Sequence, residues 1–342
     1  MPAPARLEDI AMQLGVAVST VSRALAGNPA ISASMREQVQ AAAAEMGYRL
    51  PEQGRRPRKS ANRIVGVVIG ALHNRFMTLL LEHLHDALHD AGYQITLIID
   101  TMHEASALQT LRPLIDGYLD GLIFATATLD SPLVAELRRR GVPLVLVVRS
   151  VDEPGIDTVE IDNVHAGEEA ARHLHELGHR AIGLLMGPRN TSTSRDRAAG
   201  ALRYLQAQGL AAADIPLAFG EYTNESGYSG TMAMLNAHPG LTAIIAGNDT
   251  MAIGALEAAR RRGMAVPEHL SVIGFDDIPL AGSPLISLTT IRQPVESMAR
   301  TAARRLLARM QARGTAPAVH DVLPIQLVQR GTTAAPSASA RP

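Results

Sequence analysis

Three small hydroxyl side chains and one arginine lie within five residues near the start of the chain. They are Ser19, Thr20, Ser22 and Arg23, in the stretch VSTVSRAL. Hydroxyl groups bond phosphate oxygens and are short enough to let a helix approach DNA closely. An arginine beside them can donate two hydrogen bonds to guanine O6 and N7, worth roughly 1–3 kcal/mol of discrimination. The pattern favours DNA binding, and an ordinary polar surface helix is the alternative.

A second set of candidate residues follows short apolar runs further along the chain. The set comprises Asn74, Phe76, Arg149, Arg195, Arg197, Asn248, Asp249 and Asp276. Ligands of parallel sheets bind outside the carboxyl ends of the strands, where such residues would gather. Carboxylates accept hydrogen bonds from hydroxyls, guanidinium groups donate them, and an aromatic ring can stack on the C–H face of a sugar. The set predicts a sugar-type effector site with Asp249 and Arg197 as main contacts; for each residue the alternative is a structural cap or ion pair.

Catalytic and metal-binding patterns are weak. The chain has no Gly-x-Ser-x-Gly, Walker A or Gly-x-Gly-x-x-Gly motif at a suitable place, and it has no cysteine. The best metal candidate is the stretch EHLHDALHD, which places His85 and His89 four residues apart. A solvated or dimer-facing helix side is the simpler interpretation of that pair. We therefore predict no enzymatic activity, no cofactor and no metal.

The elements that position the first set are three short helices. Apolar residues at i, i+3, i+4 and i+7 predict a helix over residues 7–14, which Gly15 ends. Val18, Val21 and Leu25 form a second apolar stripe, which we expect to face inward. Ser32 caps a third helix, and together the three predict a helix-turn-helix headpiece over residues 5–48.

The rest of the chain has a different pattern. Residues 49–63 hold two prolines, a glycine and six basic residues, which is typical of a hinge or linker. From residue 64, seven short runs rich in valine and isoleucine alternate with helical stretches. This alternation predicts an α/β domain over residues 64–330, with two lobes of doubly wound parallel sheets. The small polar residues of 331–342 predict a disordered tail.

Charge is distributed unevenly along the chain. Residues 1–63 carry a net charge of +4 within a chain whose total is −1. A basic segment on an acidic body suits a polyanionic partner such as DNA, although a solvated basic linker explains the charge of residues 55–63 equally well. No apolar stretch approaches a membrane span and the first residues do not form a secretory signal, so we expect a cytoplasmic protein without membrane contact.

The motifs, taken together, resemble those of the lac repressor/galactose repressor family of bacterial regulators. The headpiece match rests on EDIAMQLGVAVSTVSRAL, IS and AAAAEMGY. Further motifs follow in order along the body: NRF, IDN, HLHELGHR, GP with SRDRAAG, GNDTMAIGAL, LSVIGFDDIPLA and LTTIRQP. The resemblance covers residues 5–330.

This resemblance implies a homodimeric repressor that reads a pseudo-palindromic operator in double-stranded DNA and is nucleoid-associated when bound. It places Val18, Ser19 and Arg23 near bases and Thr20, Ser22 and Ser32 near phosphates. It also implies that a small effector between the lobes, a sugar, sugar acid or sugar phosphate, changes the spacing of the two headpieces. A transport-type sugar-binding protein without a DNA role is the alternative, against which the headpiece and the absent signal argue.

Several positions depart from the family pattern. Ala17 replaces the usual capping serine of the recognition helix, and Ala26 replaces a common asparagine. In the hinge, Gly54 and Pro57 occupy the usual Ala and Leu positions, and proline disfavours a helix there. We therefore predict a hinge that is not helical in the usual way. Its basic residues, Arg55, Arg56, Arg58 and Lys59, would hold phosphates while the operator bends little. Val148 stands where an aspartate often precedes the arginine, which removes one acceptor from the effector site.

Overall fold

The computed structural model describes residues 7–25, 28, 31–46, 48, 62–100, 113–115, 117–312 and 317–337. The chain divides into two compact units, residues 1–61 and residues 62–342. The hinge prediction, which concerns Gly54, Arg55, Arg56, Pro57, Arg58 and Lys59, lies outside the described residues, as does Ala26.

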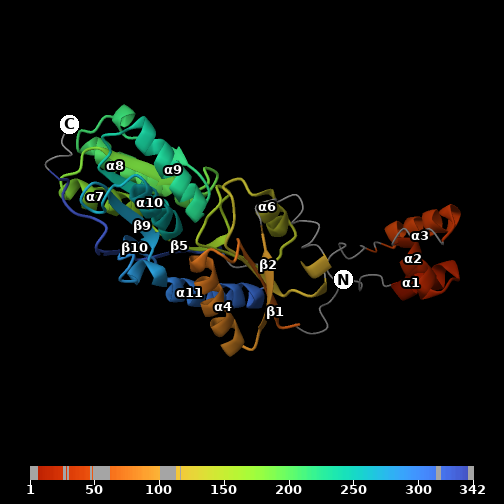
Figure 1. The fold of residues 1–342 in the computed structure, drawn as a ribbon. Helices are drawn as coiled ribbons and strands as arrows, with labels where there is room; N and C mark the ends of the chain where they lie inside the picture. The colour runs from red at the N-terminus through yellow and green to blue at the C-terminus, as the bar shows by residue number, and fades with distance from the viewer. Residues whose placement is uncertain are drawn as a thin grey trace. The chain divides into compact units, whose positions relative to one another are not determined.

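The first unit contains the three predicted helices (Figure 1). They are α1 (Leu7–Leu14), α2 (Val18–Leu25) and α3 (Ala33–Glu45). Gly15 has φ +64°, a conformation that glycine adopts without strain, and it ends α1 as predicted. Ser32 Oγ accepts a hydrogen bond from the backbone N–H of Met35 at 3.3 Å, which confirms the cap of α3. One small core, centred on Ile10, Val21 and Val39, joins the three helices.

The second unit contains two six-stranded sheets with the same strand order. The N-terminal lobe has, in spatial order, β11 (His320–Leu323), β5 (Asp157–Ile161), β4 (Leu144–Val147), β3 (Gly121–Phe124), β1 (Ile64–Ile69) and β2 (Gln94–Ile99), all parallel. The C-terminal lobe has β12 (Gln326–Val328), β10 (Thr289–Arg292), β9 (Ser271–Asp276), β8 (Ala243–Ala246), β6 (Ile182–Met186) and β7 (Leu217–Phe219). Within this second sheet only β12 runs antiparallel, against β10.

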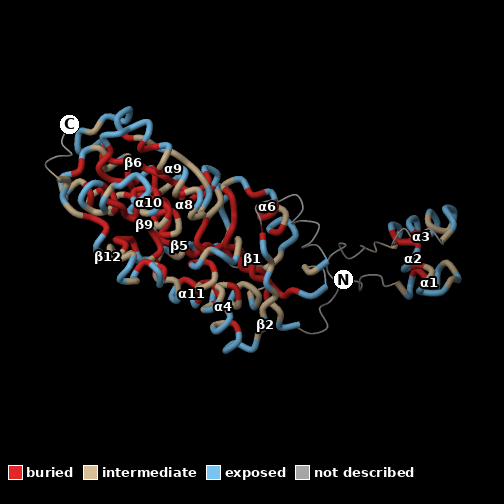
Figure 2. Tube along the Cα trace, in the orientation of Figure 1, coloured by how far each residue is buried: buried red, intermediate tan, exposed pale blue. Residues whose placement is uncertain are grey.

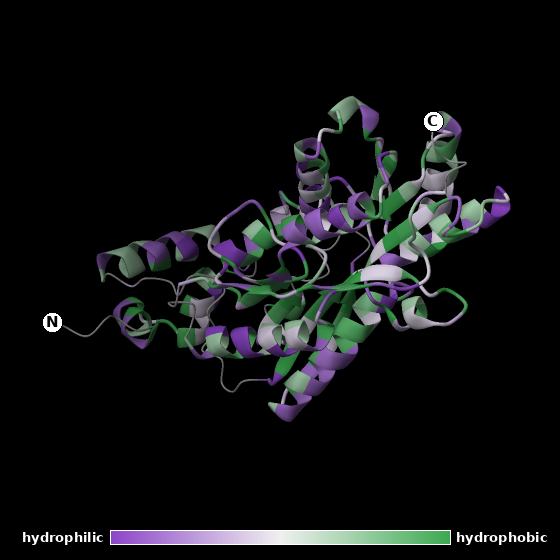
Figure 3. Ribbon diagram, turned by 90° about the vertical axis from the view of Figure 1, so that its left-hand side faces the viewer, coloured by the Kyte–Doolittle hydropathy of each residue, from purple (hydrophilic) through white to green (hydrophobic). Residues whose placement is uncertain are grey.

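Helices cover both faces of each sheet (Figure 3), and the buried apolar residues form two clusters in the interior (Figure 2). The N-terminal lobe has α4 (Arg75–Asp90), α6 (Pro132–Arg139) and α11 (Val295–Gln311). The C-terminal lobe has α7 (Asn163–Glu176), α8 (Ser192–Ala207), α9 (Asn224–Ala237) and α10 (Asp249–Arg261), with the short 3₁₀ helices η1 (Ala212–Asp214) and η2 (Pro279–Gly282). This confirms the predicted α/β class with two doubly wound lobes.

The chain crosses between the two lobes three times. The segment after β5 enters the C-terminal lobe as α7, which packs against α8. The segment after β10 returns as α11, which packs against α4 and β4 of the N-terminal lobe. The third crossing joins β11 in one sheet to β12 in the other. Each lobe is therefore built from segments that are distant in sequence.

The predicted disordered tail is wrong for residues 331–337, which are ordered against the C-terminal lobe. Thr332 and Thr333 are buried. Thr332 Oγ1 donates to the carbonyl oxygen of Val272 at 2.7 Å, and Thr333 Oγ1 lies 3.0 Å from Thr289 Oγ1. Small hydroxyl residues are common in disordered tails, but here they satisfy buried polar groups at the edge of β9 and β10.

Among the described residues, no helix combines the length and apolar character that crossing a membrane requires.

Candidate functional site

The surface of α2 presents the polar residues that the sequence singled out. Ser19, Ser22 and Arg23 are exposed, and Thr20 is half-buried. Val21, Ala24 and Leu25 are buried on the opposite side, where they hold α2 against the other two helices. Ser32 is exposed at the start of α3. The packing of one side of α2 therefore leaves its hydroxyl and guanidinium groups free to approach a nucleic acid.

Val18 differs from its expected place in the apolar stripe. Its side chain is 39% exposed, whereas the sequence pattern placed it in the core. Val18 is the first residue of α2 and is absent from the core of the headpiece, to which Ala24 contributes. Val18 thus shares the exposed side of α2 with Ser19 and Ser22.

In the second unit, Arg197 and Asp276 are buried members of the predicted effector site. Arg197 is 2% exposed, its Nε donates to Asn163 Oδ1 at 3.0 Å, and its Nη1 donates to the carbonyl oxygen of Gly247 at 2.7 Å. The guanidinium also lies over the ring of Phe275, 4.5 Å from its centroid. Asp276 ends β9 and accepts from Gln293 Nε2 at 2.6 Å. A guanidinium and a carboxylate are therefore held at one end of the C-terminal sheet.

The Asp276 residue is strained and electrostatically perturbed. Its φ is +117°, a value that L-residues rarely adopt and that often marks functional sites. Burial raises its pKa to about 6, against the opposing effects of the Arg197 charge and the Gln293 hydrogen bond. Near neutral pH, the group is therefore a carboxylate that accepts hydrogen bonds strongly.

Asn248 and Asp249 have structural contacts in this conformation. Asn248 caps α10, accepting from the backbone N–H of Met251 at 2.9 Å. Asp249 has no exposed surface; its Oδ2 accepts from the N–H of Ile278 at 2.9 Å and its Oδ1 from Thr290 Oγ1 at 2.5 Å. Burial, followed by the charge of Asp276, raises its pKa well above the usual range. In this conformation both carboxylate oxygens hold the segments after β9 and in β10, and the effector contact expected of Asp249 stays a prediction.

The N-terminal lobe contributes Arg149, which follows β4. Arg149 is 5% exposed; its Nη1 donates to the carbonyl oxygen of Thr126 at 3.4 Å, and its guanidinium lies 5.5 Å from the ring centroid of Tyr222. Burial lowers its pKa, and the charge of Arg197 lowers it further, while Tyr222 and Asp100 act in the opposite direction. Arg149 of one lobe and Arg197 of the other therefore lie within electrostatic range of each other.

Two predicted residues of the N-terminal lobe have roles in the fold. Asn74 caps α4, with its Oδ1 accepting from the N–H of Phe76 at 3.1 Å. The ring of Phe76 is buried in the core beneath α4. In this conformation the ring has almost no exposed surface, and the stacking contact expected of it stays a prediction.

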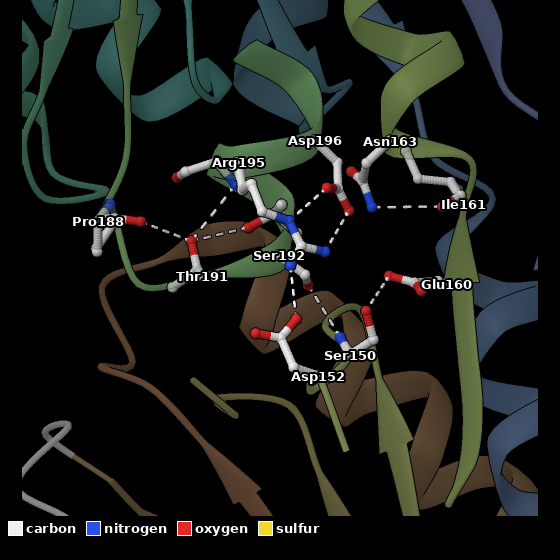
Figure 4. Close-up of polar contacts among 12 residues, drawn as sticks. Ser150, Asp152, Glu160, Ile161, Asn163, Pro188, Thr191, Ser192, Arg195 and Asp196 are labelled. Atoms are coloured by element: carbon white, nitrogen blue, oxygen red, sulfur yellow. Dashed lines mark hydrogen bonds and ion pairs between the residues drawn. The ribbon is translucent and has the colours of Figure 1, made fainter. Parts of the chain in front are cut away.

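Arg195 lies at the outer edge of the site and joins the two lobes (Figure 4). Its Nη1 donates to Asp152 Oδ1 at 2.6 Å and its Nε to Asp196 Oδ1 at 2.7 Å, and these partners raise its pKa. Nearby, the N–H of Ser150 donates to Ser192 Oγ at 3.0 Å. Arg195 is thus half-exposed and paired with carboxylates, away from the buried Arg197 and Asp276.

The sequence did not single out Tyr222, although it lies between the lobes. Its hydroxyl is 2.8 Å from both Thr193 Oγ1 and Ser194 Oγ. Its ring lies against Gly187, where an added Cβ would be 2.2 Å from the ring. Tyr222 follows β7, a three-residue strand too short to produce a recognisable apolar run, which is why its position at a strand end was missed.

Comparisons with known proteins found similarity for both units of the chain. Residues 6–50 match the model of bacterial regulatory proteins of the lacI family, and residues 171–333 match a periplasmic binding protein-like domain. The HTH-type transcriptional regulator MalR of Streptomyces coelicolor is 35% identical over 349 residues, covering 98% of this chain and 99% of that protein.

Two solved structures extend the similarity over nearly the whole chain. A complex of the transcriptional regulator CelR with cellobiose has a TM-score of 0.73 and 29% identity, covering 96% of this chain and 99% of that one. The lac repressor dimer bound to operator and the anti-inducer ONPF has a TM-score of 0.71 and 28% identity, covering 97% and 100%.

A helix-turn-helix headpiece followed by a two-lobed, periplasmic-binding-protein-like domain defines a DNA-binding transcriptional regulator. The chain belongs to the lacI family of bacterial regulatory proteins. These findings give no support to the alternative of a transport-type sugar-binding protein without a DNA role.

Proposed function

We propose that this regulator binds a pseudo-palindromic operator as a homodimer, with α2 of each subunit in a major groove, and represses transcription. The main support for this proposal is that α2 is amphipathic. Its apolar side, formed by Val21, Ala24 and Leu25, is buried. Its polar side, with Ser19, Ser22 and Arg23, is exposed. Bases would be contacted by Val18, Ser19 and Arg23, and phosphates by Thr20, Ser22 and Ser32.

We also propose that a small effector binds between the lobes, at the carboxyl ends of the strands. Asp276 would accept hydrogen bonds from effector hydroxyls, and Arg149, Arg197 and Asn248 would donate them. Tyr222, which lies between Arg149 and α8, would supply an aromatic surface for the effector. Sugars are the first candidates, since CelR is described with cellobiose; sugar acids and sugar phosphates follow because of the two arginines.

The DNA-binding proposal is tested with a panel of promoter fragments and scrambled competitors, measured at several salt concentrations. We expect one fragment to be preferred, with an affinity that falls steeply as salt rises, because phosphate contacts release counterions. Arg23→Ala should lower the preference by about 1–3 kcal/mol, while the exposed control Met12→Ala should leave it unchanged. A chain that binds no fragment above its scrambled competitor contradicts the proposal.

The effector proposal is tested by a thermal-shift screen of sugars, sugar acids and sugar phosphates. A compound that raises the unfolding temperature should lose this effect in Asp276→Asn. The same compound should change operator affinity, and operator DNA should change the affinity for the compound by the same factor. If the shift persists in Asp276→Asn, the effector binds elsewhere.

The hinge supplies a further part of the proposal. Pro57 disfavours a helix there, so Arg55, Arg56, Arg58 and Lys59 would contact phosphates without an apolar wedge in the minor groove. Bending assays on the preferred fragment should therefore show only a small central kink. A large kink would contradict this view of the hinge.

A further inference from the structure

We propose that the rims of the two lobes are joined by a latch, which holds the lobes closed before any effector binds. The latch consists of three polar contacts that cross from one lobe to the other. Its members are Leu129, Ser150 and Asp152 of the N-terminal lobe and Asn190, Ser192 and Arg195 of the C-terminal lobe. The sequence placed Arg195 among the effector contacts, and the latch gives this residue a different role.

The first contact is an ion pair between the lobes. Nη1 of Arg195 donates to Asp152 Oδ1 at 2.6 Å (Figure 4). Nε and Nη2 of Arg195 donate to the two carboxylate oxygens of Asp196, at 2.7 and 3.3 Å, which orients the guanidinium from its own helix. On the other side, Glu153 pairs with Arg138 of α6 and holds the loop that carries Asp152. Each end of the ion pair is therefore held in place by its own lobe.

The other two contacts are hydrogen bonds from backbone amides. The N–H of Leu129 donates to the carbonyl oxygen of Asn190 at 2.9 Å, and the N–H of Ser150 donates to Ser192 Oγ at 3.0 Å. Ser192 begins α8 and has no exposed surface. Parting of the lobes breaks both bonds, so hydrogen exchange of these two amides reports the opening of the latch.

Each rim is also cross-linked within its own lobe. The N–H of Asp152 donates to the carbonyl oxygen of Leu129 at 2.8 Å, which joins the loops after β3 and β4. In the C-terminal lobe, Thr191 Oγ1 donates to the carbonyl oxygen of Pro188 at 2.8 Å and accepts from the N–H of Ser194 as the cap of α8. Because both rims are held in this way, the three contacts break and form together.

Solvent limits the strength of the latch. The side chains of Arg195 and Asp152 are 45% and 64% exposed, so water and salt weaken their attraction. Exposed ion pairs of this kind shift an equilibrium by about two- to fivefold. The latch therefore favours closed lobes and still opens reversibly.

The consequence for ligand binding rests on the proposed effector site. A ligand enters between the lobes while the latch is open, and the latch forms again when the lobes close on it. The latch is then present in both the free and the bound closed states. Weakening it should speed association and dissociation by about the same factor and leave the affinity nearly unchanged.

The test is hydrogen exchange of the full-length, ligand-free protein, measured at single amides by mass spectrometry with electron-transfer fragmentation. In Asp152→Asn and in Arg195→Gln, the amides of Leu129 and Ser150 should exchange about two- to fivefold faster than in the parent. The double variant should show no further increase, because either substitution alone removes the ion pair. The amide of Val148, which is bonded within its own lobe, should keep its rate in every variant.

Two further variants separate the latch from a general loss of stability. Arg203→Gln removes an exposed ion pair of α8 with Glu168, which lies within one lobe, and should leave the rates of both latch amides unchanged. Reversal of the latch pair, Arg195→Asp with Asp152→Arg, restores the attraction and should return the rates toward those of the parent. Denaturant unfolding checks that each variant folds.

The proposal is overturned if the amides of Leu129 and Ser150 exchange equally fast in the parent and in both single variants. It is equally overturned if the double variant adds the full effects of the two single variants. Unchanged amide rates together with a lost affinity for a screened compound would make Arg195 an effector contact instead. Altered amide rates without any binding compound would support the latch and contradict the proposed effector site.

Discussion

In the N-terminal lobe, β4 is followed by Val148 and Arg149, whereas the equivalent strand of the C-terminal lobe, β9, ends in Asp276 and is followed by Asp277. Both strand ends have a residue with positive φ: +72° at Val148, directly after β4, and +117° at Asp276, the last residue of β9. A positive φ therefore occurs at this strand end in both lobes, while the side chains there are chemically different.

The hydrogen bonds around these strand ends also differ between the two lobes. In the C-terminal lobe, Arg197 and Asp276 are bonded within their own lobe, to Asn163, the Gly247 carbonyl and Gln293. In the N-terminal lobe, Arg149 makes a long hydrogen bond to Thr126 and lies over an aromatic ring of the other lobe. The C-terminal strand ends are thus held in place within their lobe, while Arg149 is surrounded partly by the opposite lobe. Relative movement of the lobes should disturb Arg149 most.

The largest effect on stability is expected when the buried arginine of each lobe, Arg197 or Arg149, is replaced separately. Arg197→Met removes the hydrogen-bond donor to Asn163 Oδ1 and to the Gly247 carbonyl oxygen and the positive charge near Asp276, and should lower the free energy of unfolding by about 3–5 kcal/mol. Arg149→Met should cost less, because burial already disfavours the charged form of this side chain. Denaturant unfolding of both variants measures the difference, and equal losses would contradict the contrast between the lobes.

A somewhat smaller loss of stability is expected when Asp249 is replaced. Asp249→Ala leaves the N–H of Ile278 and the hydroxyl of Thr290 without their acceptor and should cost about 1–3 kcal/mol. The loss should appear with and without effector, because the role is structural. Asp130→Ala, which removes an exposed carboxylate of the N-terminal lobe, serves as the control and should stay within about 0.5 kcal/mol of the parent. A variant that keeps its stability but loses effector binding would restore Asp249 as a ligand contact.

The dependence of stability on pH provides a third test. The folded-state pKa of Asp276 is about 6, above the usual aspartate value of 3.8, so the folded state holds its proton more tightly than the unfolded state does. The contribution of this group to the free energy of unfolding therefore falls as the pH rises from 3.8 to about 6. Asp276→Asn should reduce that slope, leaving the part due to Asp249. An unchanged slope would show that other groups, and not Asp276, cause the pH dependence of stability.

The smallest effect is expected at Val148. Val148→Gly relieves a positive φ in a β-branched residue, which offsets the loss of its buried side chain, so stability should change by about 1 kcal/mol or less. Val147→Gly, one residue earlier in β4 and fully buried, has no strain to relieve and should cost about 2 kcal/mol or more. Similar losses in both variants would show that the strain at the end of β4 carries little energy.

Strand prediction succeeded where the strands are purely apolar. The seven apolar runs correspond to β1, β2, β3, β4, β6, β8 and β9. The strands β5 and β10 were not identified, because buried polar residues such as Glu160, Thr289 and Thr290 interrupt their apolar pattern. Those groups are satisfied by distant partners: Glu160 by His320, Thr289 by Thr333 and Thr290 by Asp249. No local pattern reveals such pairings.

The sequence by itself determined the helix-turn-helix pattern, the polar side of α2 and the alternation of strands and helices, since these follow from the spacing of apolar side chains along short segments. Only the tertiary structure decided which partners surround two nearby carboxylates. Asp249 and Asp276 both lie at the ends of apolar runs, but Asp249 accepts hydrogen bonds from Ile278 and Thr290, while Asp276 ends its strand near the charge of Arg197. The distinction lies in hydrogen-bond donors that segments remote in sequence bring to each acid.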